Sequence, residues 1–150
     1  ETSADMANTL GVSDAVVRRS SKCLSSDVNA AYDPNFAEVH ERRNSCFANG
    51  GVVITKFTGS RGKSGSNDAS AEFMGFVRSV LDDAGVVWQT SELGKVDAGG
   101  GGTVAMYIAQ KNVDVVDLGV PVLSMHAPYE VVAKTDVYMT HKAIAAFFAK

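Results

Sequence analysis

The sequence predicts an α/β domain in which a largely parallel or mixed sheet is flanked by helices. Short runs rich in β-branched residues, such as GVVITKF at 51–57 and VDVVDLG at 113–119, are typical of buried strands. Two longer segments, 69–84 and 136–149, repeat apolar residues at helical spacing. The two kinds of segment alternate without an internal repeat or an interdomain linker, so we expect one domain over 1–150.

The first third of the chain carries the weakest signals. Residues 1–20 show a loose helical pattern, with three valines on one side. We expect KCLSSDV at 22–28 to form a short strand that breaks into the turn-rich NAAYDPNF. The polar segment AEVHERRNSC at 37–46 is expected to be exposed.

The middle of the chain contains a clearer pattern. After the first β-branched run we expect a loop at 58–70, because glycine and serine are dense there. Asn67 or Asp68 would serve as the N-cap of the next helix. That helix occupies 69–84, and Gly85 ends it.

The last third alternates strands and helices again. We expect strands at 86–92, 113–119 and 120–125, with a helix near 103–111 that follows a run of glycines. A final helix spans 136–149, and its expected core-facing residues are Val137, Ile144, Phe147 and Phe148.

Composition and charge exclude several classes of protein. The chain is 45% hydrophobic and 21% charged, with a net charge of −3, which is ordinary for a globular protein. This charge gives no reason to expect nucleic acid or an anionic membrane as a partner. We see no run long enough for a membrane span and no signal-peptide pattern. The two cysteines lack metal-site spacing and fit a reduced cytoplasm, and the start at Glu1 suggests a piece of a longer protein.

Two side chains at predicted strand ends are candidate metal ligands. In LGVPVLSMHAPYE at 118–130 an apolar run stops just before His126, and Pro128 stiffens the segment that follows. Loops at strand ends often carry functional groups, and a neutral imidazole binds divalent metals well. Asp27 in SSDV also follows a short apolar strand. The alternatives are a hydrogen-bonded structural histidine and a carboxylate that only caps a turn.

Two loops are candidate binding segments. The glycines of VDAGGGGT at 96–103 would let a backbone approach a ligand closely, although the run is neither GxGxxG nor a P-loop. A tightly turned loop without a ligand is the alternative. Residues 58–68 include Arg61 and Lys63, which suit either a solvated basic loop or a contact with a substrate carboxylate or a second subunit.

Four segments in this order resemble the M18 family of metalloaminopeptidases, and the bacterial members most: SSDVNAAYDPNF, GVVITKFTGSRGKSGSNDAS, VVWQTSELGKVDAGGGGT and DVVDLGVPVLSMHAPYEVV. The resemblance runs from about Lys22 to Phe148, and residues 1–21 match loosely. It implies a layered zinc-exopeptidase-like fold, of the aspartyl aminopeptidase and aminopeptidase I type. This chain would be the C-terminal part of the catalytic domain. It further implies a cytoplasmic zinc enzyme that acts on peptide substrates and forms a homo-oligomer.

The resemblance also implies roles for individual residues. Asp27 and His126 fall on two ligands of a site that holds two zinc ions, which together activate a water and polarise the scissile carbonyl. Asp97 is a weaker candidate for the wall beside the substrate. The family's glycine–threonine loop at that wall falls on Gly101, Gly102 and Thr103.

The sequence departs from the family pattern in ways that limit this assignment. The tetrapeptide SADM at 3–6 imitates the ligand motif around Asp5, but only Asp27 is followed by NAAYDPNF at the family's distance from GVVITK. Ala30 stands where eukaryotic members have a histidine. The family's Glu-Glu pair, which supplies the general base, is absent, so no catalytic residue is assigned in this chain.

We therefore expect the isolated chain to be inactive. Two alternatives belong to other classes of function. One is a non-catalytic structural or assembly module of a homo-oligomer, with 58–68 as an intersubunit loop. The other is a nucleotide-binding domain that uses the glycine run at the start of a helix.

Overall fold

A four-stranded mixed sheet forms the centre of the molecule in a computed structural model that describes residues 2–61, 64–95 and 97–150. Its strands lie in the order β1 (Lys22–Ser25), β8 (Asp114–Gly119), β3 (Val52–Thr55) and β6 (Trp88–Thr90). β1 runs parallel to β8 and β6 parallel to β3, whereas β8 and β3 are antiparallel. The predicted α/β class with a mixed sheet and flanking helices is confirmed.

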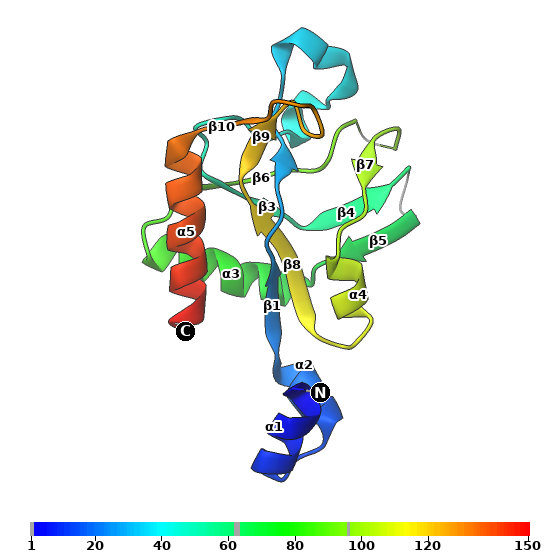
Figure 1. The fold of residues 1–150 in the computed structure, drawn as a ribbon, viewed down its shortest axis with the longest axis vertical. Helices are drawn as coiled ribbons and strands as arrows, with labels where there is room; N and C mark the ends of the chain where they lie inside the picture. Colours follow the sequence, from blue (N-terminus) through cyan, green and yellow to red (C-terminus); the bar gives the residue numbers. More distant parts are fainter. Residues whose placement is uncertain (1, 62–63, 96) are drawn as a thin grey trace.

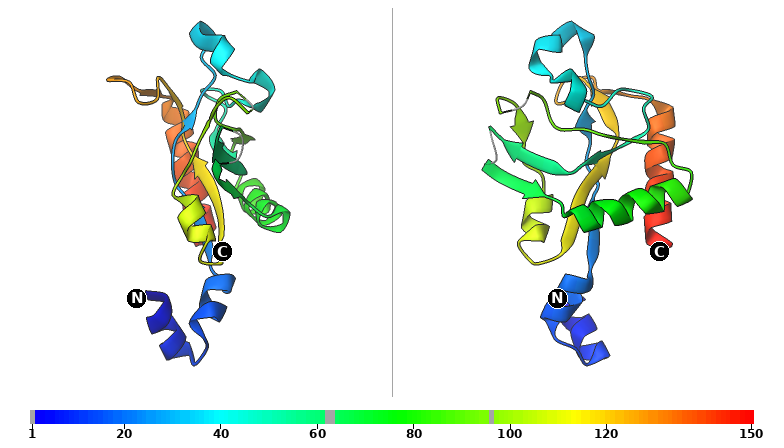
Figure 2. Two further views of the ribbon diagram at one scale, coloured as in Figure 1. Left: turned by 90° about the vertical axis from the view of Figure 1, so that its right-hand side faces the viewer. Right: turned by 180° about the vertical axis from the view of Figure 1, so that it is seen from behind.

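Two three-stranded sheets extend from this centre. After β8 the chain enters β9 (Pro121–Leu123), which pairs parallel with β2 (Asn29–Ala30) and antiparallel with β10 (Val131–Val132). The other sheet contains β5 (Ser64–Asp68), β4 (Phe57–Ser60) and β7 (Gly100–Gly101) in that order. Figure 1 and the reverse view in Figure 2 show it on the opposite side of the central sheet from helix α5 (Lys134–Phe148).

The main core lies between the central sheet and the helices α3 (Ala71–Asp83) and α5. The short helix α4 (Ala105–Ala109) packs beside β8 and β5. Core residues from the strands and both long helices are at most 2% exposed: Ile54, Phe73, Val77, Leu81, Val116, Leu118 and Ala143. Burial of such side chains stabilises the fold by roughly 1.5–3 kcal/mol for each large one.

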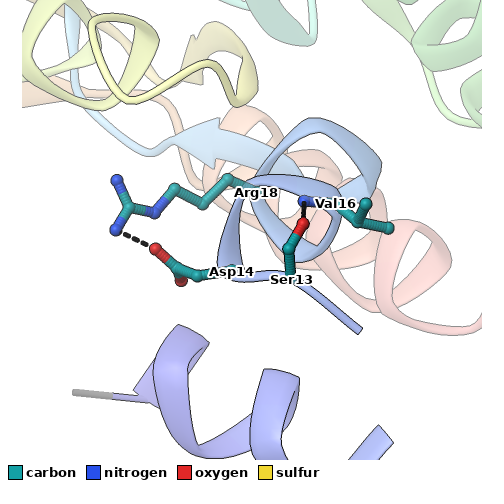
Figure 3. Close-up of polar contacts among 4 residues, drawn as sticks. All are labelled: Ser13, Asp14, Val16 and Arg18. Carbon is teal, nitrogen blue, oxygen red and sulfur yellow. Dashed lines mark hydrogen bonds and ion pairs between the residues drawn. The ribbon is translucent and has the colours of Figure 1, made fainter. Parts of the chain in front are cut away.

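The N-terminal helices α1 (Thr2–Leu10) and α2 (Asp14–Ser20) pack on one another and project from the body (Figures 1 and 2). The Ser13 hydroxyl caps α2 by accepting a hydrogen bond from the Val16 N–H at 3.4 Å. Arg18 forms an ion pair with Asp14 on the same helix (Figure 3). Over the described residues, the structure contains no helix with both the length and the apolarity that a membrane crossing needs.

The polar segment before β3 forms short turns at the top of Figure 1. These are the 3-10 helices η1 (Pro34–Val39) and η2 (Arg42–Asn44), which are largely exposed as predicted for 37–46. The end of that segment differs, because Ser45 and Cys46 are buried. They lie beside the core, where Cys46 N–H donates to the Ser91 hydroxyl at 3.0 Å.

The prediction of a loop at 58–70 was wrong for most of that segment. β4 and β5 form a hairpin there, and its residues 62 and 63 lie outside the described part. Glycine and serine are weak strand formers, but backbone pairing with β7 on the other side of β4 supplies hydrogen bonds that do not depend on side chains. Because β5 includes Asn67 and Asp68, the N-cap of α3 is Ser70, whose hydroxyl accepts from Phe73 N–H at 3.1 Å.

The predicted inner face of the last helix was wrong in part. Val137 is 45% exposed and Phe148 is 82% exposed, although Ile144 and Phe147 are half-buried as expected. The side chains of α5 that are buried belong to Asp136, Thr140 and Ala143. The apolar pattern alone cannot set this rotation, since a buried polar contact at Asp136 fixes it. The helix predicted at 103–111 is only the short α4, which begins at Ala105.

Asp136 links the start of α5 to the turn before β3. Its Oδ2 accepts from Asn49 N–H at 2.8 Å and its Oδ1 accepts from Gly51 N–H at 2.9 Å, while the residue is 1% exposed. Asp136→Asn places an amide donor against one of these N–H groups. We expect the free energy of unfolding, measured by urea titration, to fall by about 2–4 kcal/mol. Asp83→Asn is the control, because it removes an exposed ion pair with Lys150 and should leave stability nearly unchanged.

Cys46 should be inert in the folded protein. The residue is 0% exposed, and burial raises the pKa of its thiol to about 11. The thiolate reacts with alkylating agents, so iodoacetamide at pH 8 should label Cys46 only after unfolding in urea. Because the folded pKa lies above the unfolded one, this thiol's contribution to stability is lost as pH rises from about 9 toward 11. Fast labelling of native Cys46, followed by peptide mass spectrometry, would contradict the prediction.

Candidate metal and substrate site

Asp27 follows β1 and lies against the end of β8. A Cβ atom on Gly119 would lie 1.3 Å from the backbone oxygen of Asp27, so the absence of a side chain at Gly119 allows this approach. Further along, Asn29 N–H donates to Val120 O at 3.0 Å and begins β2. The Asp27 side chain is exposed, and its Oδ1 accepts from Val28 N–H at 2.8 Å. The carboxylate is thus oriented by a local turn.

Asp117 is a buried carboxylate next to this position. It pairs with Ser25 of β1 in the strand register and is 5% exposed. Its Oδ2 accepts from the Thr103 hydroxyl at 3.0 Å, and its Oδ1 has no hydrogen-bond partner of normal geometry among the described residues. Burial raises the pKa of Asp117, the neighbouring hydroxyls of Ser25 and Thr103 lower it, and the charge of Asp27 raises it again. Two carboxylates therefore lie near the C-terminal ends of the neighbouring strands β1 and β8.

The glycine run belongs to a sheet edge and not to the start of a helix. Gly101 pairs with Gly59, and Gly100 pairs with Ser60, as strand β7 beside β4. A Cβ on Gly99 would lie 2.6 Å from the backbone nitrogen of Lys95, so this turn requires glycine. α4 begins only after the run and is a single short turn, so its amide groups offer no extended anion site.

A pocket of about 740 Å³ lies between the β4–β5 hairpin and the segment 91–100. Asp97, which has a left-handed backbone with φ 62°, lines it together with Gly99 and Gly100. Both basic and acidic residues line the cavity: Arg43, Lys56, Asp68, Glu92, Lys95 and Asp97. Gly101, Gly102 and Thr103 follow directly from this lining toward Asp117.

His126 lies in the loop that joins β9 to β10. It is exposed, and its φ of 66° is the left-handed conformation that side chains rarely adopt. Its backbone N–H donates to Glu130 Oε1 at 2.5 Å, and Ala127 N–H closes a turn onto Ser124 O at 3.0 Å. Strain of this kind persists where surrounding contacts enforce it, and it is typical of functional loops.

The structure brings some of these residues together. Asp117 joins Thr103 directly and lies near Asp27. No hydrogen bond or ion pair joins the side chains of Asp27 and His126, both of which are described. Within 2–61, 64–95 and 97–150, no group of three or more His, Cys, Asp or Glu side chains is arranged to hold a metal ion.

Residues 3–148 match the family described as aminopeptidase I zinc metalloprotease (M18). The chain belongs to the M18 aminopeptidase family. The match begins at residue 3, so it includes the N-terminal helices, which the motifs matched only loosely.

Relatives of this M18 chain are longer than the chain itself. A probable M18 family aminopeptidase 1 of Clostridium acetobutylicum is 48% identical over 150 residues, covering 97% of this chain and 32% of that protein. The crystal structure of an M18 aminopeptidase from Thermotoga maritima is similar with a TM-score of 0.87 and 41% identity, covering 93% of this chain and 32% of that one. The structure of the S. cerevisiae mApe1 dodecamer is similar with a TM-score of 0.73 and 25% identity, covering 92% and 29%. The M18 chain thus spans about a third of the length of these relatives.

Sequence reasoning missed Asp117 and Gly119. A signal for Asp117 is present, because a carboxylate inside the apolar run VDVVDLG is unusual in a buried strand. Gly119 carries no comparable signal, since its importance comes from the backbone of Asp27, a residue distant in sequence.

Proposed function

We propose that this M18 chain is the C-terminal portion of the catalytic domain of a zinc aminopeptidase. The complete enzyme would remove the N-terminal residue from peptides at a site for two metal ions. The family match over residues 3–148 carries this proposal. We place the enzyme in the cytoplasm, where the free thiols of Cys23 and Cys46 would remain reduced.

Asp27 and His126 are the residues of this chain that would hold zinc. Carboxylate oxygen and imidazole nitrogen are ordinary zinc ligands, and both side chains are exposed. The Val28 N–H fixes one carboxylate oxygen of Asp27, and this leaves the other free to bind. When bound, the ions would acidify a water and polarise the scissile carbonyl. The remaining ligands and the general-base glutamate would come from the part of the enzyme that precedes this chain.

The substrate would lie along the glycine segment. Gly101 and Gly102 let a peptide backbone approach, and β7 is an edge strand whose unpaired backbone groups can bond an extended peptide. Thr103 ends this wall, and Asp97 faces the adjoining pocket. The chain's own residues would therefore orient the peptide while zinc and the preceding part carry out hydrolysis.

Comparison of two proteins tests the proposal. The complete protein that carries this chain should bind two zinc ions, measured by plasma emission spectroscopy, and hydrolyse aminoacyl-p-nitroanilides. The 150-residue chain alone should show no such activity, because two ligands leave a zinc ion short of its usual four contacts. Measurable hydrolysis by the isolated chain, or none by the zinc-loaded complete protein, would refute the proposal.

A second candidate is a structural role in a homo-oligomer. It is favoured by the solved mApe1 dodecamer, which is similar to this chain. The hairpin of β4 and β5 at 57–68 would be an intersubunit element in such an assembly. Light scattering of the complete protein measures its assembly. A large assembly with no peptidase activity would favour this candidate over the enzyme.

A further inference from the structure

The Thr103 hydroxyl is held between buried side chains from two different sheets. It donates to Asp117 Oδ2 at 3.0 Å and lies 3.4 Å from Thr58 Oγ1. Thr58 on β4 is 2% exposed and Asp117 on β8 is 5% exposed. A threonine hydroxyl has a single proton. Because Thr103 donates this proton to Asp117, the Thr103 oxygen can only accept from the Thr58 hydroxyl. The hydrogen bonds therefore run from Thr58 to Thr103 to Asp117.

The hydrogen bond from Thr103 to Asp117 holds the end of the glycine run, whose own residues have no side chains. The run Gly99–Gly102 cannot pack against neighbours through side chains, and glycine loses more conformational freedom on ordering than any other residue. Backbone pairing of β7 with β4 holds one part of the run. Thr103 is the first side chain after it, and Val104 provides no side-chain cap for α4. The hydroxyl of Thr103 is therefore the side-chain anchor at this end.

Asp117, which accepts the Thr103 hydrogen bond, lies on β8, the strand whose end contacts Asp27. β8 pairs Asp117 with Ser25, and its last residue, Gly119, lies against the Asp27 backbone. One strand therefore connects the glycine run on one side with the candidate metal ligand on the other.

We propose that Asp117 is a positioning residue, which clamps Thr103 so that the glycine run keeps a fixed place relative to Asp27. Asp117 touches neither metal nor substrate in this role. The role rests on the proposed function, because the glycine run matters to catalysis only where it orients a peptide. Loss of the clamp would let the run move, and a displacement of about 1 Å in a substrate-positioning segment can lower a rate about 100-fold.

The clamp itself can be tested without activity. Amide hydrogen exchange of residues 99–103 is measured in the complete protein that carries this chain and in three variants of it. Thr103→Val removes the hydroxyl at similar volume, and Thr103→Ser keeps it. Thr9→Val is a matched control in α1, where the hydroxyl donates to Asp5 O of its own helix. We expect exchange about ten-fold faster in Thr103→Val alone, the effect of losing one hydrogen bond to a charged group.

The positioning role is tested by kinetics of the complete enzyme. Thr103→Val should lower kcat/KM by up to about 100-fold with zinc content unchanged, and Thr103→Ser should restore kcat/KM. In an Asp117→Ala background the Thr103→Val change should have little further effect, because the bond is already lost. If Asp117→Ala does not fold, the difference in kinetics between Thr103→Val and Thr103→Ser still tests whether the Thr103 hydroxyl positions the glycine run.

Two results would overturn the inference. Exchange of the glycine run that is unchanged in Thr103→Val would show that no clamp exists. A Thr103→Ser enzyme as impaired as Thr103→Val would show that packing, and not the hydroxyl, is what matters. If the wild-type complete protein has no peptidase activity, the proposed function fails, and the exchange measurement still decides whether the clamp exists.

Discussion

Replacement of Gly119 by alanine should unfold the chain or displace the segment around Asp27. The new Cβ would lie 1.3 Å from Asp27 O and 2.5 Å from Asp27 C, so one backbone must move away from the other. Overpacking of a side chain costs about 1–3 kcal/mol, and a clash with backbone has no flexible group to absorb it. We expect the free energy of unfolding to fall by at least about 3 kcal/mol.

Urea unfolding monitored by circular dichroism measures this change, and Gly75→Ala is the matched control. Gly75 lies inside α3, and an added Cβ there meets no atom of the described part of the chain within 4 Å. Alanine is the better helix former by about 1 kcal/mol, so the control should be stabilised. A Gly119→Ala chain as stable as the wild type would show that the contact between the end of β8 and Asp27 is not as tight as the structure has it.

Removal of either proposed ligand should abolish the peptidase activity that we propose for the complete protein. For Asp27→Asn and for His126→Gln we expect kcat/KM to fall by at least about 100-fold, because groups that merely support metal ligands already contribute 10–100-fold. Zinc content should fall as well. Thermal stability of the zinc-free protein should stay the same, since both side chains are exposed and neither fills the core.

Two residues of the same types provide controls. Asp5 lies in the SADM segment of α1, and His141 is exposed on α5. Asp5→Asn and His141→Gln should retain full activity and zinc content. Full activity of the double variant at Asp27 and His126 would rule out the metal assignment, whereas loss of activity in Asp5→Asn would favour SADM as the ligand motif.

The order of elements could be read from local patterns along the chain. β3 is a run of β-branched residues, and α3 repeats apolar side chains at helical spacing up to Gly85, so both depend on neighbours in sequence. The hairpin at 57–68 could not be found in this way. Its small polar residues form strands because β7, distant in sequence, pairs with β4.

Some residues discussed above could also be predicted from the local sequence, and others depend on contacts distant in sequence. His126 and Asp27 stand out in the sequence because each follows an apolar strand, and the resemblance to a family gives them a role. Asp136 does not stand out, and its two bonds to Asn49 and Gly51 set the rotation of α5. An apolar pattern reports only which residues avoid water, so it cannot register a buried carboxylate whose partners are backbone groups elsewhere.

The sequence by itself determined the α/β class, the position of the long helix α3, the central strands and the M18 family of this chain. Only the tertiary structure decided that Gly119 admits the Asp27 backbone and that Asp117 holds Thr103. The physical reason is that local propensity acts between residues a few positions apart. Steric exclusion and hydrogen bonding act between whatever atoms the fold brings within about 3 Å of one another.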